Sequence, residues 1–299
     1  MSAGARLAGL SADIDSVSVH LRGYGVEDAP EEGAHYRVAV PRMLELLGAA
    51  GARATFFLIA EEAERHPDTV RAIVAAGHEV GCHSWTHRLP FDVSDPQRAR
   101  REVHDARARL QELAGAPVVG FRAPSWGKNA TLVAALRAAG FRYDASSFPS
   151  WMLFLLRWSV SRRSAGPRER LGSSLREALL DPAAPHLLAG TPPLAELPLC
   201  TTPLARLPYY HTLRYLLPAP FFGLLGAAAR LRRTPTYAFH AVDFLAVEAD
   251  GLDARIARHP GMDRPLAAKL ELARRSVDEL GRGRAVVPLR QLAESLLGA

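Results

Sequence analysis

Two histidines four residues apart, His83 and His87, form the clearest metal-binding pattern in the sequence. Imidazoles at this spacing can bind one ion from a helical turn or a tight loop, and neutral imidazole suits zinc and its neighbours. A chain with 11 histidines also produces such pairs by chance. The pair alone is therefore also compatible with a second interpretation, in which both residues are surface histidines beside a tryptophan and bind no metal.

Two carboxylates, Asp13 and Asp15, end the first apolar run of the chain. Alternate residues of a strand share a face, so both acids can reach one site. Two acids after an apolar run are costly without a partner or a cation. Two histidines and one aspartate leave coordination positions open for water and substrate, which is the pattern of catalytic metal sites.

Two further polar residues end predicted strands. Arg122 closes an otherwise apolar segment, where an arginine usually pairs with a carboxylate. His240 ends the segment TYAFH, and Asp243 follows closely. Each residue alone could be a satisfied buried polar group. Together, four polar clusters at the carboxyl ends of four predicted parallel strands match the position of active sites in α/β barrels.

The elements that must position these residues alternate along the chain. Apolar runs predict strands over residues 7–15, 54–60, 78–83, 118–123, 141–145, 195–200, 236–242 and 285–289. Amphipathic periodicity predicts helices over residues 36–50, 61–76, 96–114, 129–139, 265–280 and 291–297, with Asp95 as an N-cap. Alternating strands and helices indicate an α/β fold with parallel strands and right-handed crossovers.

An insertion at about residues 148–233 interrupts this alternation. It contains the apolar segments WMLFLLRW (151–158) and LPYYHTLRYLLPAPFFGLLGAAA (207–229), followed by arginines at 230, 232 and 233. The prolines at 218 and 220 leave a stretch too short to span a bilayer. We predict a single domain over residues 1–299 whose insertion forms a lipophilic lip beside the site. The alternative is an ordinary helical subdomain packed on itself.

Composition excludes several classes of protein. Of 299 residues, 48% are apolar and 23% charged, as in soluble folded chains rather than disordered ones. Two cysteines cannot build a disulfide framework. The net charge of +6 contains no basic block interleaved with aromatics, so we expect no nucleic-acid partner. The first 15 residues lack the apolar run of a signal peptide. We therefore expect a cytoplasmic protein, peripheral at the inner face of the membrane.

The order Asp-x-Asp, His-x-x-x-His, Arg-x-Pro and a late strand-end histidine resembles the polysaccharide deacetylase (NodB-homology, carbohydrate esterase 4-like) family. SADID stands at that family's Thr/Ser-Phe-Asp-Asp motif, and GHEVGCHSWTH matches its metal motif. GFRAPSW, FRYDASSFP and ELPL resemble a sub-branch associated with exported polysaccharides. YAFHAVDF resembles instead deformylases that act on aminoarabinose linked to undecaprenyl phosphate.

This resemblance implies a distorted (β/α) barrel of about seven parallel strands and hydrolysis of an N-acetyl or N-formyl group on an amino sugar. It implies a divalent metal, with zinc as the first expectation and cobalt, nickel or iron also suited. Matching the motifs residue by residue, the resemblance implies that the metal ligands are Asp15, His83 and His87. It implies that Asp13 is the base, oriented by Arg122, and that His240 is the acid. The substrate-binding turn would consist of Pro124, Ser125 and Trp126.

Two assignments remain open at this level. Because Ile14 separates the two acids, Asp13 and Asp15 could exchange roles. The carboxylate that supports the acid could be Asp144, Glu196 or Asp243.

The resulting hypothesis is an N-deacylase of a lipid-linked or membrane-proximal amino sugar, with no obligate protein partner. Its rivals are an allantoinase-like hydrolase of a small amide and an inactive carbohydrate- or lipid-binding module.

Overall fold

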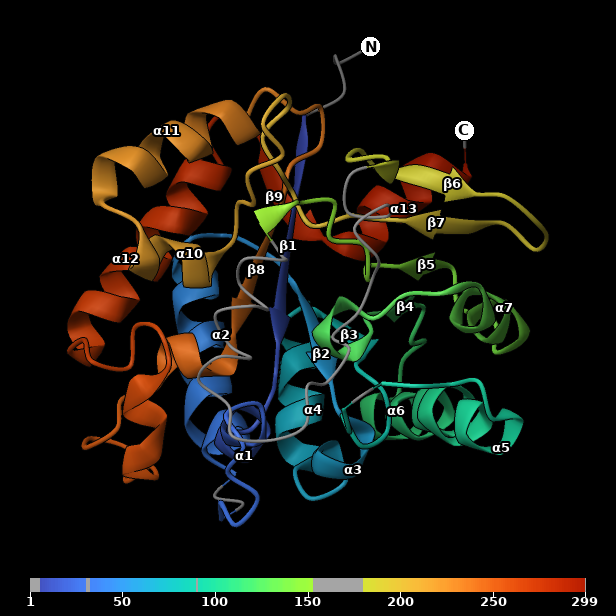
Figure 1. The fold of residues 1–299 in the computed structure, drawn as a ribbon, viewed down its shortest axis with the longest axis horizontal. Helices are drawn as coiled ribbons and strands as arrows, with labels where there is room; N and C mark the ends of the chain where they lie inside the picture. The colour runs from blue at the N-terminus through green and yellow to red at the C-terminus, as the bar shows by residue number, and fades with distance from the viewer. Residues whose placement is uncertain (1–5, 31–32, 90, 153–179, 299) are drawn as a thin grey trace.

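One sheet, with nine strands in the described residues, organises the protein (Figure 1). The computed structural model describes residues 6–30, 33–89, 91–152 and 180–298. The strands run in the order β6-β7-β5-β4-β3-β2-β1-β8, and β9 also pairs with β1. Their bounds are β1 Leu7–Asp13, β2 Thr55–Leu58, β3 Glu79–Cys82, β4 Gly120–Phe121, β5 Tyr143–Asp144, β6 His186–Leu188, β7 Leu194–Glu196, β8 Thr236–His240 and β9 Ala285–Pro288.

The predicted α/β fold is confirmed, with a difference in strand number. All strand pairs are parallel except β6 with β7. Within the described residues no pair joins β8 or β9 to β6 or β7, so the curled sheet is an incomplete barrel. The described strands exceed the seven or so that the family resemblance implied and the eight predicted from apolar runs; the additional strand is β6, a short antiparallel edge strand without a periodic signal.

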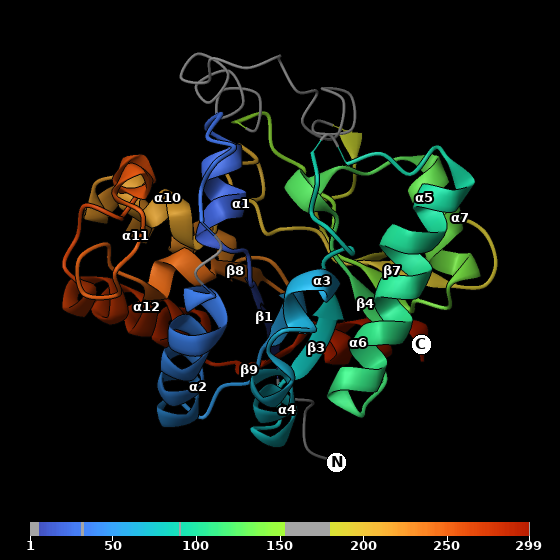
Figure 2. The same ribbon diagram turned by 90° about the horizontal axis from the view of Figure 1, so that it is seen from below.

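Helices cover the sheet on its outer side and beside β8. They are α1 Val17–Arg22, α2 Val40–Ala49, α3 Ala60–Ala63, α4 Pro67–Ala75, α5 Pro96–Ala99, α6 Ala106–Ala114, α7 Ala130–Ala138, α10 His211–Leu216, α11 Ala219–Ala229, α12 Leu266–Leu280 and α13 Leu289–Leu297. Short π or 3-10 turns are η1 His35–Ala39, η2 Arg100–Asp105, η3 Pro124–Trp126, η4 Ala241–Phe244 and η5 Ala254–Arg258. In Figure 2, α2, α4 and α6 lie in a row, with α10, α11 and α12 grouped beside β8.

Local sequence signals explain where the helices begin and break. The Asp95 carboxylate accepts a hydrogen bond from the Arg98 N–H at 2.7 Å, which confirms the predicted N-cap. The predicted helix over 61–76 is wrong as one element, because it divides into α3 and α4 at Pro67. Proline cannot donate a backbone hydrogen bond and disfavours helical conformation in the residue before it.

Two hydrophobic cores lie on opposite sides of the sheet. The larger packs the helices on the outer face and includes Leu10, Phe56 and Leu110. The smaller lies inside the curl, where Phe57 and Tyr143 meet side chains of α13. Residues 8–13 of β1 are all buried, so Asp13 reaches its position from a strand fixed on both faces.

The apolar insertion is described only in part. Most of the predicted segment 151–158 lies outside the described residues. The described part packs as a helical pair, with α10 against β8 and Phe222 of α11 against Tyr209, 5.3 Å between ring centroids. The opposite side of α11 exposes Phe221 and Leu224 by 64% and 68%. Among the described residues, none of the helices has the length and apolar character needed to traverse a bilayer.

Candidate metal centre and catalytic residues

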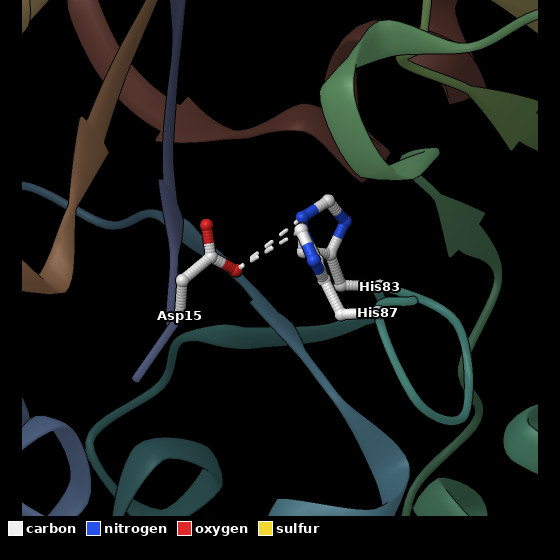
Figure 3. Close-up of side chains that lie close together, drawn as sticks. All are labelled: Asp15, His83 and His87. Atoms are coloured by element: carbon white, nitrogen blue, oxygen red, sulfur yellow. Dashed lines mark ion pairs between the residues drawn. The ribbon is translucent and has the colours of Figure 1, made fainter. Parts of the chain in front are cut away.

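Asp15, His83 and His87 converge at the carboxyl ends of β1 and β3 (Figure 3). All three are buried, and one ligand atom from each lies within 4.8 Å of the others. The Asp15 Oδ1 atom is 3.5 Å from His83 Nε2 and 3.7 Å from His87 Nε2. A carboxylate and two imidazoles aimed at one point are the donor set of a divalent transition-metal ion.

The His83 ring is oriented by the backbone of the neighbouring strand. Its Nδ1 lies 2.7 Å from the carbonyl oxygen of Arg122. A carbonyl only accepts, so Nδ1 carries the proton and the Nε2 lone pair is directed toward Asp15. Fixing a ligand tautomer through the distal ring nitrogen is characteristic of metal-binding histidines.

The loop between the two histidines is held in a strained conformation. Ser84 and His87 have φ angles of 71° and 53°, which non-glycine residues rarely adopt. The buried Glu102 carboxylate accepts the Trp85 and Thr86 N–H groups at 3.0 and 3.1 Å and the Thr86 hydroxyl at 2.7 Å. These bonds maintain the strain that places the His87 ring beside His83.

Electrostatics within the ligand set favour a cation. Burial raises the pKa of Asp15 well above its usual value, and the negative charges of Asp13 and Glu62 raise it further. Burial lowers the pKa of His83 and, more strongly, of His87, so both are neutral ligands at neutral pH. Asp15 Oδ1 has no hydrogen-bond partner in the described structure. The three residues therefore fit a divalent metal, which would neutralise the buried carboxylate.

Asp13 lies on the same rim in a different electrostatic setting. Its Oδ1 accepts a hydrogen bond from Arg122 Nη1 at 2.6 Å, and its Oδ2 is 3.8 Å from His240 Nε2. Burial alone would raise the pKa of Asp13, but the Arg122 guanidinium, aided by its hydrogen bond and the neighbouring imidazoles, lowers it. Asp13 is thus ionised and oriented, whereas Asp15 needs a cation.

The Arg122 side chain is buried and anchored at several points. Its Nε donates to the Ala145 carbonyl at 3.2 Å, and its guanidinium lies 4.3 Å above the centre of the Phe57 ring. The following turn contains Ser125 and Trp126, whose φ angles are 52° and 54°. This strained turn holds the predicted substrate-binding residues beside the site, with Pro124 buried at its start.

His240 projects from the end of β8 toward Asp13. Asp243 Oδ2 accepts the His240 backbone N–H at 2.8 Å, so this acid fixes the main chain. Trp126 lies edge-on to the imidazole, with ring centroids 6.2 Å apart. The Asp243 backbone N–H approaches the His240 side chain as in a capping box, but within the described residues the buried His240 Nδ1 makes no hydrogen bond of normal geometry. In the described structure, none of the three candidate carboxylates bonds to the ring.

The other two candidate carboxylates form a separate cluster at β5 and β7. Asp144 and Glu196 are register partners on these strands and are fully buried. Lys128 Nζ lies 3.0 Å from Glu196 Oε2 and 3.6 Å from Asp181 Oδ2. Burial raises the pKa of both Asp144 and Glu196. Lys128 and Asp181 also line a cavity of about 370 Å³ between α7 and β6.

Sequence reasoning missed several residues behind the ligands. Glu62 accepts the Ser16 hydroxyl at 2.8 Å and pairs with His35 Nε2 at 2.9 Å. Glu102 organises the histidine loop. The signal for Glu102 was available, because it stands next to Val103 on the buried side of its helix, where an unpaired acid is costly. His35 had no comparable signal.

The fold and the site define an incomplete α/β barrel with a His-His-Asp cation site at the carboxyl ends of its strands. A family profile described as polysaccharide deacetylase matches residues 26–143. A chitooligosaccharide deacetylase of Bradyrhizobium sp. (strain ANU 289) is 32% identical over 186 residues, which are 60% of this chain and 77% of that protein. The chain belongs to the polysaccharide deacetylase family.

Two other proteins are similar to this chain, one in sequence and one in fold. A peptidoglycan deacetylase of Helicobacter pylori (strain ATCC 700392 / 26695) is 31% identical over 144 residues, so the match spans 47% of this chain and about half, 49%, of that protein. A solved Mycobacterium smegmatis structure assigned to the polysaccharide deacetylases covers 100% of this chain and 92% of its own, with a TM-score of 0.63 and 20% identity. The latter supports the fold.

Proposed function

We propose that this protein is a metal-dependent hydrolase that removes the N-acetyl or N-formyl group from an amino sugar. One observation carries the proposal: an arginine-held carboxylate, a strand-end histidine and a His-His-Asp cation site share one rim. The two relatives compared above are named as deacetylases of chitooligosaccharide and of peptidoglycan. Their names support an N-acylated sugar as the substrate of this protein.

The charged base is Asp13. Its Oδ1 is occupied by Arg122, so Oδ2 is the atom that accepts a proton from the attacking water. The water oxygen forms a bond to the acyl carbon as this proton leaves. Because the charges around Asp13 lower its pKa, the carboxylate is ionised throughout the neutral range and can act as a general base.

The acid is His240, which donates its Nε2 proton to the departing sugar nitrogen as the carbon–nitrogen bond breaks. Without that proton an amine anion would have to leave. The products are a carboxylic acid, acetic or formic, and a free amino sugar. We propose that a backbone N–H of the turn at Ser125 donates a hydrogen bond to the oxyanion. This turn has the strained backbone conformation described above.

Asp15, His83 and His87 would hold the metal, with zinc as the first expectation and cobalt, nickel or iron as alternatives. When bound, such an ion lowers the pKa of water and polarises the acyl oxygen.

The test is release of acetate or formate from defined substrates. Purified protein is reconstituted with zinc and incubated with N-acetylated chitooligosaccharides and with formylated amino sugars. We expect that the protein releases acid, that EDTA abolishes this release and that zinc restores it. The Asp13→Asn variant should release no acid even when it is fully loaded with zinc. Absence of release from every N-acylated sugar by the zinc-loaded protein would contradict the proposal.

A finer proposal concerns the carrier of the sugar. We infer that the substrate is linked to a lipid and that the protein binds the inner face of the membrane as a peripheral protein in the cytoplasm. Support comes from Phe221 and Leu224, both exposed on α11, and from Arg230 and Arg233 just beyond the helix. Exposed apolar side chains near basic residues suit an anionic membrane surface.

Vesicle sedimentation tests this finer proposal. The protein should pellet with vesicles of phosphatidylglycerol and phosphatidylcholine, less at high salt. The double variant Trp151→Glu and Phe221→Glu should abolish pelleting, whereas Leu187→Glu on β6, also an exposed apolar position, should not. Equal turnover of a soluble sugar and its lipid-linked form, or unchanged pelleting of the double variant, would defeat the idea.

A further inference from the structure

The imidazole of His240 has a histidine neighbour where a supporting carboxylate was expected. The His20 ring of α1 lies 5.8 Å from the His240 ring between centroids, with an interplanar angle of 73°. Asp13 faces the opposite nitrogen of His240, and Asp243 holds the His240 backbone. Among the described residues, the aromatic rings that contact the His240 ring are those of His20 and Trp126, and of these two only His20 is ionisable.

In the part of the chain that the structure describes, both rings retain a buried nitrogen without a hydrogen bond of normal geometry, although the Asp243 backbone N–H approaches the His240 side chain. These atoms are His240 Nδ1 and His20 Nε2. Buried polar atoms are almost always hydrogen-bonded, and an unpaired one costs about 1–3 kcal/mol. Catalytic hydrogen bonds are often long in a substrate-free enzyme and tighten when substrate binds. Two neighbouring imidazoles, one able to donate and one able to accept, can satisfy each other in this way.

A second histidine fixes the first. The His259 ring lies 4.7 Å from that of His20, and its Nδ1 is 3.1 Å from the Tyr24 hydroxyl. Burial lowers the pKa of His20 well below its usual value, and it lowers the pKa of His259 to about 3. Both rings are therefore neutral at physiological pH. Other titratable groups around this row are His87 and His35, which act on His20, and Lys269 of α12, which acts on His259.

We propose that His20 is the positioning residue of His240: in the substrate complex its Nε2 accepts a hydrogen bond from His240 Nδ1–H, in place of a carboxylate. This inference rests on the proposed function, in which His240 is the acid. The bond keeps the proton-donating Nε2 of His240 directed at the leaving nitrogen. Because the acceptor is neutral, it orients the imidazolium without the charge stabilisation that a carboxylate gives.

This difference yields a distinctive pH signature. The acid works only while His240 carries the proton that it donates, so activity falls at alkaline pH. A carboxylate at position 20 stabilises the imidazolium, so His20→Glu should move the alkaline limb of kcat/KM upward by about one pH unit. His20→Gln keeps a neutral acceptor and should leave that limb in place.

The decisive variant is His20→Phe, which keeps a ring but removes the acceptor. We expect kcat to fall about tenfold to a hundredfold, a loss typical when the partner of a functional imidazole is removed. Zinc content and KM should be unchanged, and His20→Gln should restore most of the rate. Wild-type kcat in His20→Phe, or an alkaline limb that does not move in His20→Glu, would overturn the proposal.

A measurement without turnover separates this inference from the proposed function. Histidine ring ¹⁵N shifts of the zinc-loaded protein, assigned with His240→Gln, report the tautomer and the pKa of His240. We expect an Nδ1–H tautomer that shifts in His20→Phe and a raised His240 pKa in His20→Glu. If these hold while no N-acyl sugar is cleaved, the reaction assignment fails and the positioning role stands. Unchanged His240 shifts in both variants would refute the role.

Discussion

Two buried carboxylate clusters occupy the same edge of the sheet, and among the described residues Glu196 of one is paired with a lysine, whereas Asp15 of the other contacts no lysine or arginine side chain. At β5 and β7, Glu196 lies 3.0 Å from Lys128 and also accepts the Ser147 N–H at 3.0 Å. At β1 and β3, Asp15 faces two neutral imidazoles, and its Oδ1 has no hydrogen-bond partner in the described structure. Similar acids at similar depth are thus neutralised in different ways.

The comparison teaches how to separate a structural cluster from a ligand site. A buried charge is tolerated when it is paired and hydrogen-bonded. The Lys128 cluster meets the pairing part of this condition with a side chain of the chain itself, although Asp144 Oδ2 and Glu196 Oε2 lack a hydrogen-bond partner in the described structure, as Asp15 Oδ1 does. The Asp15 cluster meets it only with an added cation. The predictions below test this distinction.

The largest effect is expected from the ligand histidines. His83→Ala and His87→Ala should each remove bound metal and reduce acid release below detection, because each supplies one of three ligand atoms. The fold should survive, since the ligands end a strand or lie in a loop. Metal analysis and circular dichroism check both claims. Full metal occupancy in either variant would remove that residue from the ligand set.

The next effect separates the two acids. Asp13→Asn should retain metal and lower kcat about 10²- to 10⁴-fold, the contribution of a general base. Asp15→Asn should lose metal, because an amide is a far poorer ligand than a carboxylate. Metal content measured beside kcat decides the matter. The reverse pattern would show that the acids have exchanged roles around Ile14.

A smaller and different effect is expected from Lys128→Met. Breaking a buried ion pair from one side costs about 3–5 kcal/mol, so urea unfolding should show a stability loss in this range. Metal content should stay normal. Adding Glu196→Gln should recover part of the loss, because the uncompensated charge is then removed. Metal loss in Lys128→Met would mean that the two clusters are not independent.

The smallest effect concerns the metal-free protein. The raised pKa of Asp15 means that the folded state binds this proton more tightly than the unfolded state. The Asp15 carboxylate therefore destabilises the metal-free fold increasingly as pH rises above about 4, the usual aspartate pKa. Asp15→Asn should raise Tm of the metal-free protein by about 2–4 °C at pH 7, and the gain should shrink toward pH 4. An equal gain in Tm at every pH in this range would contradict the raised pKa of Asp15.

The sequence predicted the strands that carry chemistry because each ends in a polar residue after an apolar run, as Asp13 and His240 do. It predicted the convergence because parallel strands align their carboxyl ends. The split of a helix at Pro67 was readable but overlooked. The edge strand β6 was not readable, because three residues give no periodicity.

The partners of the site were less predictable. That Asp243 bonds a backbone N–H rather than an imidazole depends on the 3-10 turn after β8, which no spacing rule specifies. The approach of His20 to His240 joins residues 220 positions apart in the sequence through the packing of α1 beside β8. Such contacts arise from tertiary packing and leave no local pattern.

The pairing of β1 has a consequence for the order in which the molecule is made. Its first half pairs with β9, in the register Leu7 with Ala285, and its second half pairs with β8 up to Asp13 with His240. The strand that ends in Asp13, two residues before Asp15, is thus bordered by segments that leave the ribosome more than 200 residues later. The contact of Asp13 with His240 therefore forms only after β8 has been synthesised, whereas all three metal ligands lie in the first third of the chain.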